Sequence, residues 1–172
     1  MRFTLLALFL LLISYSVSAQ ESQAILSIRR VVAGINADSG YKIKTLDNED
    51  LLDKDSSEAS DNGQGLKAFY KAGRLKKLVY SVGLSFAMRT YEYYFDGMNV
   101  VFIFEKEADY PERKDGIGLD NSKLIPAFER RFYIENNKII LTKTKGRQRI
   151  PESDNQRPLT LLKDLLADIK NK

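Results

Sequence analysis

Four glutamates on or beside predicted strands are the side chains of this sequence best suited to acid–base chemistry. Glycoside hydrolysis requires only two carboxyl groups at a defined separation, so a carboxylate-dependent hydrolase acting on envelope or extracellular glycans is one open interpretation. The alternative interpretation is a structural role, in which each carboxylate lies on the wet face of a sheet and pairs across strands with a lysine or arginine. The many nearby basic residues favour this alternative. The four residues are Glu92, Glu105, Glu107 and Glu135.

Other catalytic and metal chemistries are restricted by the residue inventory. The sequence contains no histidine and no cysteine, which removes serine–histidine and cysteine–histidine nucleophiles and zinc sites built on imidazole or thiolate. Asp53 and Asp55 have the opening spacing of a calcium loop, but Glu58 and Gln64 occupy the positions that require glycine and glutamate. We therefore predict no catalytic residue, no metal site and no cofactor, and an enzyme is the less favoured class.

Two groups of side chains could instead bind a ligand or partner. Tyr91 and Tyr93 share one face of a predicted strand, where they would either form an exposed aromatic patch or fill the core, and we favour the core. A second group occupies alternate positions near the end of the last strand, so that its side chains point to one side of it. These residues would either attract an acidic partner or keep an edge strand from aggregating. This second group is Lys143, Lys145, Arg147 and Arg149.

Hydrophobic periodicity places these residues on a few elements. Apolar residues spaced by three and four predict a helix from Ser22 to Asn36, and alternation predicts a strand over Tyr41 to Thr45. An acidic loop follows over about 47–65, then a sheet of hairpins over about 66–150. A second amphipathic helix is expected over about 158–170.

The hairpin region contains one unit three times, in which an aromatic residue precedes a turn and an aliphatic strand returns. The turns are Ala72-Gly73, Asp96-Gly97 and Asn136-Asn137, whose residues tolerate positive φ. We predict an α+β fold in which the hairpins form an antiparallel meander and both helices cover one face of it. The alternative is an open, strongly bent sheet that wraps around the C-terminal helix. The long connection 108–126 would pass around an edge or over a face.

The beginning of the chain has the three parts of a secretory signal. Arg2 precedes an apolar run from Phe3 to Ile13, and the segment ends in Val17-Ser18-Ala19. We predict a signal peptide at 1–19 and a single secreted domain at 20–172, soluble in the periplasm or outside the cell and without a membrane span. The modest net charge of +4 is unlike that of a nucleic-acid-binding protein.

The three units, with the stretches YEYYFDG and FIFEKE, resemble variant MORN repeats of small exported bacterial proteins of unknown function. This resemblance implies a hairpin fold and an export route. Because some MORN-variant proteins are described as antitoxin components, it also implies an inhibitor or immunity role.

The function expected from the sequence is a secreted, non-enzymatic binding or structural module with a protein partner in the envelope or outside the cell. Its recognition surface would be the sheet face, the 108–126 connection or the basic residues near the chain's last strand. A glycan hydrolase and a small-ligand carrier are the alternatives.

Overall fold

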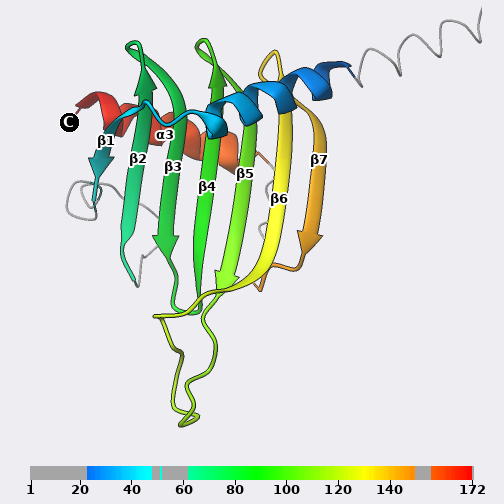
Figure 1. Ribbon diagram of the computed structural model, residues 1–172. Helices are drawn as coiled ribbons and strands as arrows, with labels where there is room; N and C mark the ends of the chain where they lie inside the picture. The colour runs from blue at the N-terminus through cyan, green and yellow to red at the C-terminus, as the bar shows by residue number, and fades with distance from the viewer. Residues whose placement is uncertain (1–22, 48–50, 52–61, 150–155, 172) are drawn as a thin grey trace, which may run out of the picture.

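The fold is a seven-stranded antiparallel sheet in which every strand pairs with its neighbours in the chain (Figure 1). The computed structural model describes residues 23–47, 51, 62–149 and 156–171. The predicted meander of an α+β fold is confirmed. Its strands are β1 (Lys42–Leu46), β2 (Gln64–Lys71), β3 (Arg74–Gly83), β4 (Ala87–Asp96), β5 (Asn99–Asp109), β6 (Ile125–Glu135) and β7 (Lys138–Gly146).

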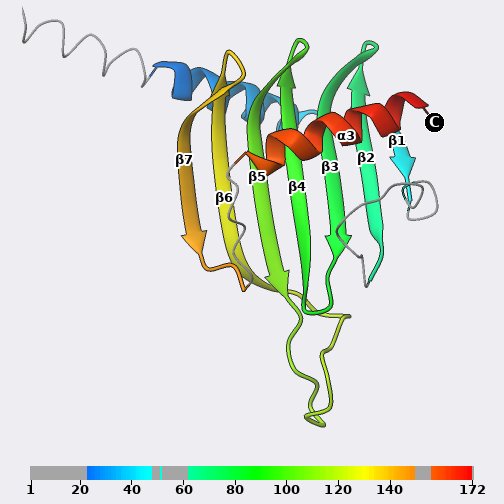
Figure 2. The same cartoon turned by 180° about the vertical axis from the view of Figure 1, so that it is seen from behind.

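One helix packs on each face of this sheet. The N-terminal helix, described over 23–37, crosses one face, and α3 (Arg157–Asn171) crosses the other (Figures 1 and 2). The expectation that both helices cover one face was wrong. Near the hairpin turns the strands carry apolar side chains on both faces, so each face can bury one amphipathic helix.

The three predicted hairpins are present, and their turns follow the local sequence. Both loop residues have positive φ in Ala72-Gly73 (49° and 73°) and in Asn136-Asn137 (51° and 59°), as a type I′ turn requires. The middle turn is Gly97-Met98 and not the predicted Asp96-Gly97, because Asp96 ends β4 and Asn99 begins β5. Of these two loop residues only Gly97 has positive φ (61°). Since Met98 follows it without positive φ, this turn has the pattern of type II′, which places glycine first.

A β-bulge recurs at the same place in each hairpin. The pairing register shifts directly after Phe69, Tyr94 and Tyr133. At each shift the returning strand contains one additional residue, which increases the local bend and twist. The repeated sequence unit is therefore also a repeated structural unit.

The larger part of the core lies between the sheet and α3. The residues of this cluster alternate along the central strands, as a sheet with one fully covered face requires. From the helix, Leu162, Leu165 and Ile169 pack against it at helical spacing. Fully buried sheet residues of this cluster include Leu66, Leu78, Tyr91, Tyr93, Ile103 and Phe132.

A smaller cluster holds the N-terminal helix against the opposite face. Ile25, Ile28 and Ile35 of the helix pack with Tyr94, Phe102 and Tyr133 of the sheet. The helix crosses only the end of the sheet that carries the hairpin turns (Figure 1). No other described element covers the remainder of this face.

The connection between β5 and β6 is a long hairpin loop that projects beyond the sheet (Figure 1). The expectation that it passes around an edge or over a face was wrong, because β5 and β6 are direct neighbours. Backbone hydrogen bonds order it, including Asp120 N to Pro111 O (2.8 Å) and Arg113 N to Gly118 O (3.0 Å).

Among the described residues, none of the helices has the length and apolar character needed to cross a bilayer.

Candidate functional site

The sheet face below the N-terminal helix is a solvated surface, which we call the open face. Two rows of cross-strand neighbours define it. Its residues are partly or fully exposed. Their neighbours in sequence on the α3 side are buried on β3, β4, β5 and β6 and exposed on β7. The first row is Val79, Glu92, Phe104, Arg131 and Lys143, and the second is Ser81, Thr90, Lys106, Glu129 and Lys145.

The open face and its margin are strongly basic. Lys67 pairs with Val79 at the β2 side, and Lys77 lies beside Tyr94 under the helix. With Lys106, Arg131, Lys143 and Lys145 there are six cations against the two anions Glu92 and Glu129. The resulting excess of +4 equals the formal charge of the whole chain, so the remaining charges of the sequence balance one another.

An aromatic ring lies between cations at the centre of the open face. The Lys106 ammonium is 5.3 Å from the centroid of the Phe104 ring, and the Arg131 guanidinium carbon is 4.7 Å from it. Both distances are within the range of cation–π attraction. Phe104 is half-buried, so the ring and the two cations form a combined apolar and positive contact surface on rigid strands.

Glu92 organises the cations next to this ring. Its carboxylate pairs with Lys77 at 2.6 Å and also with Lys106, and it accepts a hydrogen bond of 2.7 Å from the Tyr94 hydroxyl. Burial alone would raise the pKa of Glu92, but these three donors outweigh burial and lower the pKa to about 2. Glu92 is therefore ionised at neutral pH and fixes two lysines in place.

The basic residues predicted near the last strand separate into two pairs. Lys143 and Lys145 belong to the open face, opposite Arg131 and Glu129. The strand ends at Gly146 (φ 78°), where a Cβ would lie 2.0 Å from the Ala127 carbonyl oxygen, so the chain changes direction there. Arg147 and Arg149 follow this turn and do not continue the row.

Arg149 has contacts of its own on the α3 side. Its guanidinium carbon lies 5.4 Å from the centroid of the Phe86 ring, and its backbone N–H donates to Glu107 Oε1 at 3.2 Å. It therefore helps to attach the segment after β7 to the sheet.

Tyr91 and Tyr93 are fully buried under α3, each 0% exposed. Their rings lie 6.3 Å apart in a stacked arrangement, and Tyr80 continues the stack. They fill the core and form no accessible aromatic patch. The aromatic residue that does reach the open face is Phe104, which lies among the cations and was not singled out from the sequence.

The candidate carboxylates are divided between the two faces of the sheet. Glu92 lies on the open face, whereas Glu105 and Glu107 are 0% and 1% exposed on the α3 side. Glu105 pairs with Arg130 at 2.8 Å and Glu107 with Arg89 at 2.7 Å. The cross-strand pairing expected for them is confirmed, but these two pairs are buried rather than wet. Glu92 and Glu105 cannot flank one glycosidic bond, because the sheet separates them.

The loop between β5 and β6 presents an apolar tip. Ile117 lies between Gly116 and Gly118 and is 76% exposed. Its backbone N–H donates to Asp115 Oδ1 at 3.0 Å. The tip is thus an exposed aliphatic side chain on an ordered loop, at the sheet end opposite the hairpin turns (Figure 1).

These features define a helix–sheet–helix protein with a basic open sheet face. Comparison of the chain with protein-family models, curated proteins and solved structures gave no match.

Proposed function

We propose that this chain is a secreted, non-enzymatic binding module that recognises an acidic surface of a protein in the envelope or outside the cell. The observation that carries the proposal is the excess of +4 on and beside the open face, around Phe104. A more specific version of this proposal is an inhibitor or immunity protein, which forms an equimolar complex with one partner.

The rigidity of the surface supports a binding role. Most of its cations are anchored on strands, and Lys77, Lys106 and Arg131 are held by ion pairs with the glutamates of the same face. For these three side chains, less conformational entropy remains to be lost when a partner binds. Cations on the complementary surface also accelerate encounter with an acidic partner.

A protein partner is favoured over a nucleic acid. The surface contains the two carboxylates Glu92 and Glu129, which would repel a phosphate backbone, and the chain carries 23 acidic residues against 27 basic ones. Nucleic-acid interfaces are much more uniformly positive. Ile117 offers a second contact, since an exposed aliphatic side chain suits an apolar pocket on a protein.

The test is affinity capture of the partner with matched charge variants. Tagged protein comprising residues 20–172 would be incubated with native envelope and culture fractions, and proteins retained in near-equal amounts would be identified by mass spectrometry. We expect one stoichiometric protein that is lost with the double variant Lys143→Glu, Lys145→Glu. Retention of that protein by the double variant would remove the open face from the proposal.

Lys163→Glu is the matched control for this experiment. Lys163 is an exposed lysine of α3, on the other side of the sheet. The same charge reversal at this position should leave capture unchanged. Equal loss with Lys163→Glu would show a general effect of net charge and no specific surface.

A further inference from the structure

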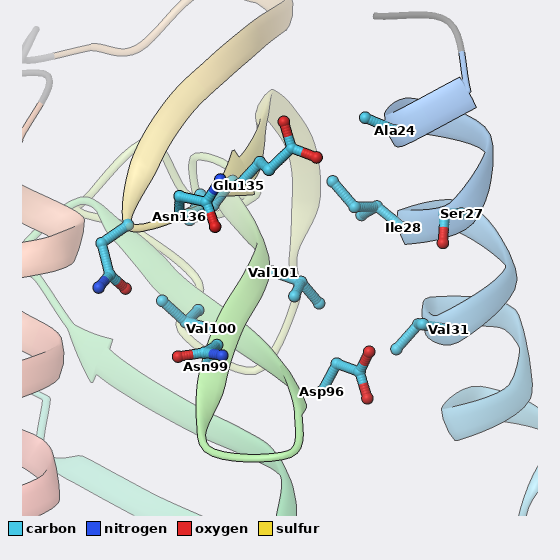
Figure 3. A pocket seen from close by; sticks show the side chains of 12 residues that line it. Ala24, Ser27, Ile28, Val31, Asp96, Asn99, Val100, Val101, Glu135 and Asn136 are labelled. Atoms are coloured by element: carbon cyan, nitrogen blue, oxygen red, sulfur yellow. The ribbon is translucent and has the colours of Figure 1, made fainter. Parts of the chain in front are cut away.

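A separate pocket lies at the hairpin end of the sheet, between the N-terminal helix and two hairpin turns (Figure 3). Its volume is about 440 Å³, which is within the range of small-molecule sites. Ile28 and Val31 line it from the helix, and Val101 lines it from β5.

The polar lining of this pocket is acidic and neutral. Asp96 is the last residue of β4 and Glu135 is the last residue of β6, and Asn136 follows in the β6–β7 turn. The lining contains no lysine or arginine, in contrast to the open face on the same side of the sheet. Neither Asp96 nor Glu135 forms an ion pair with another described residue, and Lys138, the register partner of Glu135, is not part of the lining.

The position of the pocket follows from the repeated hairpin unit. The bulge in the middle hairpin turns Val101 as well as Phe102 toward the helix, which provides aliphatic surface below the turns. The turn residues then place carboxylate and amide groups around that surface (Figure 3). An aliphatic base with acidic groups at its rim is complementary to an apolar chain that ends in a cation.

We propose that this pocket binds an aliphatic primary amine. The hydrocarbon chain would pack against Ile28, Val31 and Val101. An ammonium group would donate hydrogen bonds to Asp96 or to Glu135, whose carboxylates lie at opposite ends of the pocket (Figure 3). An ammonium has three N–H donors and no acceptor, so carboxylates and the side-chain carbonyl of Asn136 are suitable partners. The amine could be a free diamine or a lysine side chain, which share this chemistry.

The test is a titration of the isotopically labelled protein followed by NMR. The probes are 1,5-diaminopentane, N-acetyl-lysine methylamide and the neutral isostere 1,5-pentanediol. We expect the amines to shift backbone amide signals of residues 24–31, 96–101 and 134–137, and the diol to bind at least tenfold more weakly. Tighter binding of one amine than the other would identify the source of the ammonium.

Two variants and one control locate the site. The pair Asp96→Asn, Glu135→Gln should weaken amine binding by about tenfold or more, and Ser27→Phe should block the pocket from the exposed side of the helix. Asp115→Asn, which removes an exposed carboxylate from the distant β5–β6 loop, should have no effect. Equal binding of diol and diamine, absence of binding by both amines, or unchanged binding by the variants would each overturn the proposal.

Discussion

Arg130 and Glu105 face each other on β6 and β5, and their side chains are joined at 2.8 Å with exposures of only 7% and 0%. The second carboxylate oxygen of Glu105 accepts a hydrogen bond of 2.9 Å from Gln148 Nε2. Gln148 lies in the segment after β7. The buried pair therefore also fixes the path of the chain as it leaves the sheet toward α3.

Removal of one member of this pair should strongly destabilise the fold. Arg130→Met leaves the Glu105 carboxylate buried without its cation, for which we expect a loss of about 3–5 kcal/mol in the free energy of unfolding. Urea denaturation followed by circular dichroism measures the change. The adjacent Arg131→Met, on the open face, should cost no more than about 1 kcal/mol. If the two variants lost equal stability, the buried pair would have no special role.

Acid should destabilise the protein in part through Glu92. Because its pKa is lowered to about 2 from 4.5, its contribution is complete above about pH 5 and is lost as the pH falls toward 2. The contribution is at most about 3 kcal/mol. Thermal unfolding measured from pH 7 to pH 2 should show a smaller decrease of Tm for Glu92→Gln than for the wild type.

Glu129→Gln serves as the comparison for this pH series. Glu129 pairs with Arg131 on the same face, and its side chain is more exposed than that of Glu92, at 30% against 12%. This variant should retain the acid dependence of the wild type. A wild-type acid dependence in Glu92→Gln would contradict the assignment.

Binding of the proposed acidic partner should depend on salt. Since exposed cations are screened within about 10 Å at 0.1 M ionic strength, we expect the association rate to fall steeply between 0.05 and 0.5 M NaCl (about tenfold). Surface plasmon resonance with the captured partner measures this rate. Lys143→Glu, Lys145→Glu should lower the rate at low salt and flatten its salt dependence, while a salt-independent rate would exclude electrostatic attraction by the open face.

Two turn variants should change stability in opposite directions. Ala72 adopts a φ of 49°, a left-handed conformation that is costly for an L-residue, so Ala72→Gly should stabilise the fold by up to about 1 kcal/mol. Gly97→Ala introduces the same strain at a φ of 61° and should destabilise it by about 1–2 kcal/mol. No atom lies within 4 Å of the Cβ that Gly97→Ala adds. The shift of its denaturation midpoint therefore reports backbone strain.

Much of the fold follows from local sequence patterns. Turn chemistry at Asn136-Asn137 and helical spacing of Leu162, Leu165 and Ile169 depend on neighbouring residues alone, and the elements that they predict are present. The choice of sheet face for each helix was not predictable in this way. Both faces near the turns are apolar, and a single sequence does not indicate which helix buries which face.

The candidate site was predictable only in part. Lys143 and Lys145 were identified by their parity, and the structure places them on the open face. Phe104 and Arg131 were missed because their proximity arises from the register between β5 and β6, a long-range property. Arg89 and Arg130 were missed for another reason: charged residues on strands normally face water, and the signal for their burial is the partner glutamate on the adjacent strand.

The order of strands in the sheet, identical to their order in the chain, also constrains how the protein can assemble. A chain that emerges amino end first can pair each new strand with one that has already emerged, so no strand waits for a distant partner and loop-closure costs stay small. The two helices must wait: the N-terminal helix packs on β4, β5 and β6, which are made after it, and α3 comes last and covers the larger core. Until it docks, the rings of Tyr91 and Tyr93 remain uncovered, and this is the stage at which the nascent protein is most vulnerable to aggregation.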